Sequence, residues 1–138
     1  MLRAIHLNWR HLCELDVGAC RGHHRIMLIY KIFRAHEWAI LETQGSTTGA
    51  PVDVTDGYIH FSTAAQAAET AAKHFAGEEG LVLLGVTTST MDGDLRWEKS
   101  RGGALFPHLY RDLRMTDVAW HKPLPLGPDG HCFPEEMV

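Results

Sequence analysis

The stretch that most constrains the fold is residues 57–66, GYIHFSTAAQ, which has the pattern of a strand leading directly into a helix. Ile59 and Phe61 alternate with polar residues, and this period of two is typical of a half-buried strand whose apolar side chains face the core. The opposite face then carries the phenol, imidazole and hydroxyl of Tyr58, His60 and Ser62. The alternative is an ordinary edge strand whose polar groups face water.

The helix that follows has a recognisable beginning and end. Thr63 can cap its N-terminus, and Gln66 three residues later completes a capping box. Alanines then recur at helical spacing up to Phe75, and Gly77 is a natural stop. The polar groups of the preceding strand would therefore lie near the positive end of a helix, which suits an anionic or hydroxyl-rich ligand.

Composition indicates one globular domain that is not built to bind nucleic acid. The chain has 138 residues, of which 45% are hydrophobic and 22% are charged, as in ordinary globular proteins. The net charge is -4 with histidine neutral and no basic cluster stands out, so the expected partner is a small nucleotide-like ligand rather than nucleic acid. Ten histidines would reverse the sign of that charge at mildly acidic pH.

Cysteine content and hydropathy favour a cytoplasmic protein without membrane partners. Cys13, Cys20 and Cys132 make an odd count, and reduced thiols are therefore expected. The longest apolar runs are too short to span a bilayer, and the first residues lack the pattern of a signal peptide. The sequence leaves the oligomeric state open.

The first 26 residues differ in pattern from the rest, and a clean apolar run begins at Met27. We therefore divide the chain into an N-terminal extension at 1–26, a domain at 27–126 and a polar tail at 127–138. Translation could begin at Met1 or near Met27, and we predict that the extension is dispensable for folding.

Zinc-type ligands are present in the extension, namely His11, Cys13, Cys20 and His23. Four such groups could close a tetrahedron, but the spacing of the two cysteines is not that of a standard zinc knuckle. No bound metal is expected.

The pattern of the remaining elements indicates an α+β domain. Buried strands are expected at 27–33 and 81–86, a helix at 35–44, and short strands at 95–98 and 118–121. Residues 45–56 have the composition of a loop, in which Asp53 and Asp56 are interpreted as turn residues. About five strands and two principal helices, without regular crossover helices, favour a bent or split antiparallel sheet.

Polar side chains beside the short strands are the candidates for chemistry. They are Lys31, which interrupts a buried strand, and the groups Tyr58/His60/Ser62, Arg96/Glu98 and His108/Tyr110. Together they could bind a phosphorylated sugar, with arginine on phosphate and carboxylate or imidazole on ribose hydroxyls. The chain has neither a phosphate loop of the Walker or Rossmann type nor a nucleophile elbow.

Two signatures, GYIHFST at 57–63 and FPHLY at 106–110, occur with matching segments at 29–32, 37–38, 81–84 and 95–98. In this order they resemble a small uncharacterised bacterial domain family of unknown function, over about residues 28–126. The fold of that family is similar to the superfamily of ADP-ribosyltransferases and RNA 2'-phosphotransferases. The resemblance implies an ADP-ribosyltransferase-like split, bent, mainly antiparallel sheet with two principal helices.

The resemblance also implies an NAD cleft between the halves of the sheet. Glu98 would stabilise the ribose cation left by nicotinamide, beside His60 as a second catalytic residue. Ser62 and Thr63 would lie on the central strand of the superfamily, Arg96 would pair with pyrophosphate, and His108 and Tyr110 would border the cleft. Lys31 stands where this family often has histidine, and lysine cannot replace a neutral imidazole.

Two hypotheses for the function therefore stand. The first is an NAD-using ADP-ribosyltransferase-like or glycohydrolase-like enzyme, whose carboxylate would act as in glycosidic cleavage. The second is a non-catalytic module that binds a nucleotide or another small ligand on the same fold, which the lysine at position 31 favours. Release of nicotinamide distinguishes them.

Overall fold

The computed structural model of the protein describes residues 27–137. The zinc-type residues His11, Cys13, Cys20 and His23, and the prediction that 1–26 are dispensable, lie outside this part of the chain. The described part combines α-helices with mainly antiparallel strands, so the α+β class is confirmed. None of its helices has the length and apolar content needed to cross a bilayer.

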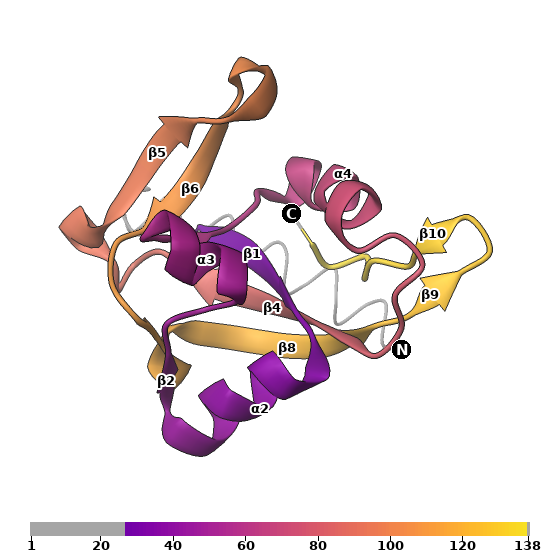
Figure 1. Cartoon of the computed structure of the whole chain (residues 1–138), viewed down its shortest axis with the longest axis horizontal. Coiled ribbons are helices and arrows are strands. Elements are labelled where there is room, and N and C mark those ends of the chain that lie inside the picture. Colours follow the sequence, from indigo (N-terminus) through magenta and orange to yellow (C-terminus); the bar gives the residue numbers. More distant parts are fainter. Residues whose placement is uncertain (1–26, 138) are drawn as a thin grey trace, which may run out of the picture.

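Two three-stranded antiparallel sheets form the frame (Figure 1). The first has the order β1-β4-β8, with β1 at Leu28–Phe33, β4 at Leu81–Thr87 and β8 at Val118–Leu124. The second has the order β3-β6-β5, with β3 at Ile59–His60, β6 at Leu105–Leu109 and β5 at Leu95–Lys99. The β5–β6 hairpin extends away from the body of the molecule.

In the described part of the chain, one isolated β-bridge joins the two sheets. The backbone N–H of Tyr30 donates to the carbonyl of Ser62 at 2.7 Å, and the N–H of Ser62 donates back at 2.9 Å. The middle of β1 and the residues that follow β3 are thereby held next to each other, although they lie far apart in the sequence.

Within residues 27–137, three α-helices accompany the sheets, namely α2 at Ala35–Gln44, α3 at Pro51–Asp56 and α4 at Ala64–His74. The predicted helix over 35–44 is confirmed with its bounds, and Trp38 and Leu41 on it are buried. The predicted capping box is also confirmed. Gln66 N–H donates to the hydroxyl of Thr63 at 3.2 Å, and Thr63 N–H donates to the side-chain oxygen of Gln66 at 3.0 Å.

The loop expected at 45–56 is wrong, because this segment holds the short strand β2 at Ser46–Thr47 and the helix α3. Pro51 occupies the first turn of α3, where its missing N–H costs nothing, and Gly57 ends the helix in the left-handed conformation at φ 86°. The composition of this segment is typical of a loop, but Pro51 and Gly57 set the beginning and the end of a short helix.

Short elements complete the chain. They are β7 at Leu113–Arg114, which pairs with β2, the hairpin of β9 at Leu126–Gly127 and β10 at Gly130–His131, and the 3-10 turns η1 at Asp92–Asp94, η2 at Arg101–Gly103 and η3 at Met115–Asp117. The expected count of about five strands was therefore too low. Apart from Leu126, the hairpin β9–β10 lies within the segment 127–138 that composition presents as a polar tail.

The core has two parts, one on each face of the sheet β1-β4-β8. Ile29 and Phe33 pack with residues of α2 and of the second sheet, whereas Tyr30 and Ile32 pack with Ala71 of α4. Because both faces of β1 are covered, the strand reads as a continuous apolar run. Lys31 lies in that buried run, only 7% exposed, and its ammonium group needs partners inside the protein.

Candidate functional site

The buried carboxylate of Asp53 organises the site. It accepts hydrogen bonds from Lys31 Nζ at 2.8 Å, from the N–H of Ala50 at 2.8 Å, and from both the N–H and the Nδ1 of His60, at 3.1 and 2.6 Å. Burial alone would raise the pKa of Asp53, but the hydrogen bond from His60 and the charge of Lys31 outweigh it and lower the pKa to about 2. Asp53 is therefore a fixed anion that ties α3, β1 and β3 together.

Lys31 is held entirely by protein groups. Its ammonium also donates to the carbonyl of His60 at 2.8 Å, and it lies 5.6 Å from the ring centre of Phe33. Burial lowers the pKa of Lys31, and the carboxylate of Asp53 opposes that shift. Lys31 is thus half of a buried ion pair at the floor of the site.

His60 lies between two carboxylates. Its Nδ1 faces Asp53 at 2.6 Å, and its Nε2 lies 2.9 Å from Oδ2 of Asp56. The ionised carboxylate of Asp53 can only accept, so Nδ1 carries the hydrogen and donates it. Both contacts are hydrogen bonds at once only in the imidazolium form. If the exposed carboxylate of Asp56 turns away, the Nε2 of neutral His60 becomes an acceptor for a ligand.

Aromatic rings connect His60 to the second sheet. Tyr58 stacks on His108 with ring centres 4.2 Å apart and contacts His60 at 4.7 Å. The pairing of β3 with β6 places His60 directly opposite His108, and their rings meet edge to face at 5.3 Å. Burial raises the pKa of Tyr58, and the charges of Asp56 and Glu98 add to that shift. These rings form one continuous polar-aromatic surface.

Glu98 supports that surface from the next strand. Its Oε1 accepts from Tyr110 Oη at 2.7 Å and lies 2.7 Å from Nδ1 of His108, and these hydrogen bonds lower the pKa of Glu98. Arg96 stacks over the ring of Tyr110 at 4.8 Å. Arg96 and Glu98 therefore extend the polar face of β3 and β6 onto β5, as strand alternation predicts.

A cavity of about 810 Å³ opens beside this surface. Its walls come from β1, α3, β3, α4 and the β5–β6 hairpin. The imidazole and phenol groups lie at the end near α3, and the basic side chains of Arg34, Lys73 and His74 line it as well. Since α4 rises 1.5 Å per residue, its two ends lie about 15 Å apart along this wall.

The structure brings together most of the residues that the sequence singles out. Lys31, Tyr58, His60, Ser62 and His108 line the cavity. The others, Thr63, Arg96, Glu98 and Tyr110, are not among its lining residues. Glu98 contacts His108, which does line the cavity. Ser62 is buried with its hydroxyl 2.9 Å from that of Thr70, and Thr63 acts as the helix cap.

Sequence reasoning missed the importance of Asp53 and Asp56. Both were interpreted as turn residues, yet Asp53 is 1% exposed and each contacts a ring nitrogen of His60. The spacing from Asp56 to His60 is four residues, and Asp53 lies seven residues before His60. Only the α3–β3 connection, which was not predicted, brings these groups together.

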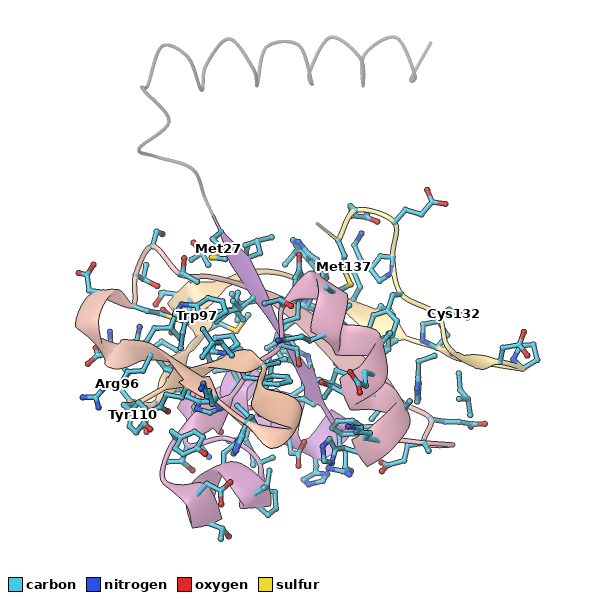
Figure 2. All side chains as sticks on the ribbon, turned by 90° about the horizontal axis from the view of Figure 1, so that it is seen from above. Met27, Arg96, Trp97, Tyr110, Cys132 and Met137 are labelled. Carbon is cyan, nitrogen blue, oxygen red and sulfur yellow. The ribbon has the colours of Figure 1, made fainter. Side chains whose placement is uncertain are left out.

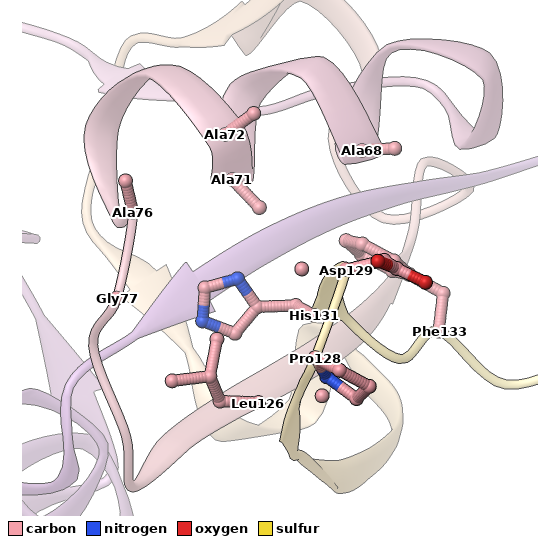
Figure 3. Close-up of a pocket in the computed structure, with 12 residues that line it drawn as sticks. Ala68, Ala71, Ala72, Ala76, Gly77, Leu126, Pro128, Asp129, His131 and Phe133 are labelled. Atoms are coloured by element: carbon pink, nitrogen blue, oxygen red, sulfur yellow. The ribbon is translucent and has the colours of Figure 1, made fainter.

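A second cavity of about 460 Å³ lies between α4 and the β9–β10 hairpin (Figure 3). Small side chains such as Ala71 and Ala72 line one wall, and Leu126 and His131 line the other. The Nε2 of His131 donates to the carbonyl of Glu78 at 2.8 Å, which anchors the hairpin. This cavity lacks the polar-aromatic surface formed by Tyr58, His60 and His108, so its lining offers fewer groups for a polar ligand.

Comparisons with known proteins identify the family. The model of the family described as "Protein of unknown function (DUF952)" matches residues 32–121. The chain is similar to the crystal structure of protein CC0527 from Caulobacter crescentus, with 50% identity, a TM-score of 0.73, and coverage of 76% of this chain and 92% of that one. It is likewise similar to the solution NMR structure of CC0527, with 50% identity, a TM-score of 0.68, and coverage of 75% and 90%. No curated protein matches. The chain belongs to the DUF952 family.

Proposed function

We propose that the 810 Å³ cavity binds a nucleotide-like ligand that carries a phosphate. The observation behind this proposal is the composition of its lining. Tyr58, His60 and Asp56 stand at one end, and Lys73 and His74 belong to the far end of α4. The volume falls in the range of small-molecule sites, which combine apolar walls with a few placed polar groups.

Each part of such a ligand has a matching group. The half-buried ring of Tyr58 lines the cavity and can stack on a base, as aromatic side chains do with nucleobases. His60 Nε2 and the Asp56 carboxylate can share the hydroxyls of a ribose. Arg34 and Lys73 can bind phosphate, although they must exchange their present partners Glu78 and Glu69 for it.

Thermal unfolding with a panel of small molecules tests this proposal. AMP, ADP-ribose and NAD should raise the melting temperature in proportion to the logarithm of their concentration, because they bind only the native state. Adenosine and orthophosphate, each carrying part of the features, should have smaller effects. Tyr58→Leu should weaken the binding of every ligand that has a base. Lys73→Gln should weaken the binding of only those ligands that carry phosphate. A panel without any shift at millimolar concentration would reject the proposal.

A second proposal keeps the ADP-ribosyltransferase-like fold and the NAD chemistry that the family resemblance implies. It is supported by two antiparallel sheets that are joined by one bridge beside the cavity, and by carboxylates at its border. The bond from ribose C1' to nicotinamide would break, with its electron pair leaving on nicotinamide. Water or an acceptor would then attack C1' and lose a proton. His60 and Glu98 remain the proposed catalytic residues.

Chromatography of released nicotinamide tests the second proposal separately from binding. Glu98→Gln should abolish release and leave NAD-dependent stabilisation in place. Glu42→Gln is the matched control, because Glu42 is an exposed carboxylate on α2 that does not line the cavity. If NAD stabilises the protein and nicotinamide is not released, the binding proposal stands and the enzymatic one fails.

A further inference from the structure

The open edge of β5 has the features of a strand-pairing surface. Within residues 27–137, β5 is the outer strand of the order β3-β6-β5 and is paired on one side only. The β5–β6 hairpin stands away from the body of the molecule (Figure 1). The sequence of β5, LRWEK, contains no proline. An uncovered edge presents unpaired N–H and C=O groups, which either stay in water or pair with another strand.

A proline in the neighbouring strand establishes which groups of β5 point outward. Pro107 lies opposite Trp97, and its carbonyl accepts from the N–H of Phe61 on the β3 side at 3.0 Å. In an antiparallel strand, the N–H and C=O of one residue point to the same side, so Trp97 and Pro107 form a non-hydrogen-bonded pair. The backbone groups of Trp97 therefore face the open edge, as do those of Leu95 and Lys99.

Because only every second residue of β5 turns its backbone groups outward, few registers are possible for pairing with a second copy across a two-fold axis. Outward-facing residues must lie opposite one another, so registers that keep most of β5 paired are centred on residue 96, 97 or 98. Centring on Arg96 sets two arginines opposite each other, and centring on Glu98 sets two glutamates opposite each other. Centring on Trp97 instead sets each Arg96 opposite the Glu98 of the other copy. Like charges in direct opposition destabilise a pair of strands, and opposite charges stabilise it.

We infer that the protein forms a homodimer through antiparallel pairing of β5 with β5 of a second copy, centred on Trp97. The two Trp97 residues exchange both backbone hydrogen bonds, and Leu95 does the same with Lys99 of the other copy. The sheets of the two copies then join into one sheet of order β3-β6-β5-β5-β6-β3. This inference is independent of the ligand proposed above.

The side chains that would meet are already ordered in one copy. Glu98 accepts from Tyr110 at 2.7 Å, and Arg96 stacks over the same ring at 4.8 Å. Figure 2 shows Arg96 and Tyr110 next to each other at the edge of the molecule. Ordered side chains lose little entropy when they associate. Trp97, which is 37% exposed, would be covered by its counterpart. Because the paired strands are short, the interface is small, and a dissociation constant in the micromolar range is expected.

Sedimentation velocity of the full chain at increasing concentration tests this inference. We expect a monomer–dimer equilibrium that weakens at high salt, since the Arg96–Glu98 pairs are exposed to solvent. Arg96→Glu and Glu98→Arg should each raise the dissociation constant at least about tenfold, because each sets like charges in opposition twice. An equimolar mixture of the two variants should recover dimers, since every pair in the heterodimer then has opposite charges. Glu42→Arg, on the exposed side of α2, is the control for a change in net charge.

Two results would overturn the inference. One is a wild-type chain that stays monomeric at every concentration. The other is a dimer that Arg96→Glu leaves unchanged. Glu98→Arg also removes the contact with Tyr110, so circular dichroism must show that this variant is folded. Recovery in the mixture distinguishes lost pairing from lost structure, because a folding defect would persist after mixing.

Discussion

The ammonium of Lys31 lies 2.8 Å from the carboxylate of Asp53, and both groups are buried. Lys31 belongs to β1 and Asp53 belongs to α3, so this ion pair joins the first sheet to the helix that carries the site. The same carboxylate orients His60 through a hydrogen bond of 2.6 Å. The pair therefore links the stability of the fold to the position of the imidazole.

Asp53→Asn should lower the free energy of unfolding at neutral pH and make that free energy depend less on pH in the acidic range. The folded pKa of Asp53, about 2, is below the ordinary value of 3.8, so the unfolded chain binds more protons between these values. The resulting stabilisation is present above about pH 4 and is lost as the pH falls through about 2. It amounts to roughly 2 kcal/mol. Urea unfolding of both proteins between about pH 6 and 2.5 measures the difference, and a difference that does not change with pH would contradict this assignment.

Lys31→Met should destabilise the protein more than loss of a surface lysine does. Removing one partner of a buried ion pair leaves an uncompensated charge and costs about 3 kcal/mol. The same substitution in the Asp53→Asn background should cost clearly less, because no buried anion is then left behind. A double-mutant cycle by urea unfolding measures this coupling, with Lys73→Met on the surface of α4 as the control. Equal costs in both backgrounds would mean that the pair contributes nothing.

Local features of the sequence predicted their structures well, and features set by tertiary contacts did not. The capping box of Thr63 and Gln66 needs only residues three positions apart, and it was predicted correctly. The alternation that sets His60 and Glu98 on polar faces is also local. By contrast, Asp53 meets Lys31 from 22 residues away, and its composition-based interpretation as a turn residue was wrong.

The site could be predicted only in outline for the same reason. Strand alternation does not give the register of β5 against β6, which places Arg96 opposite His108 and lets Glu98 reach its ring. Nor does it give the packing of α4 against β1, which forms the wall of the cavity. Residue types were therefore predictable, whereas which of them would share one cavity was not.

Expression of residues 27–138 tests the prediction that the extension is dispensable for folding. Leu28 begins β1, so the shortened chain keeps every helix and strand described above. The shortened chain should therefore unfold in a single cooperative thermal transition. Its melting temperature should lie within a few degrees of that of the full chain. Loss of the cooperative transition would mean that the first 26 residues cover the core.

Gly85→Ala should destabilise the first sheet through a steric contact rather than through backbone conformation. Gly85 lies opposite Trp120 in the β4–β8 pair, and a Cβ at position 85 would lie 2.6 Å from Cε2 of the indole. The indole is held between Tyr30, with ring centres 5.9 Å apart, and the ammonium of Lys122, so it cannot move away freely. Overpacking of this kind costs about 1–3 kcal/mol. Urea unfolding should show this loss in the single variant and a smaller loss when Gly85→Ala is added to Trp120→Leu, whose side chain leaves room for the methyl group. If the alanine costs the same in both backgrounds, contact with the indole is not the reason for glycine at this position.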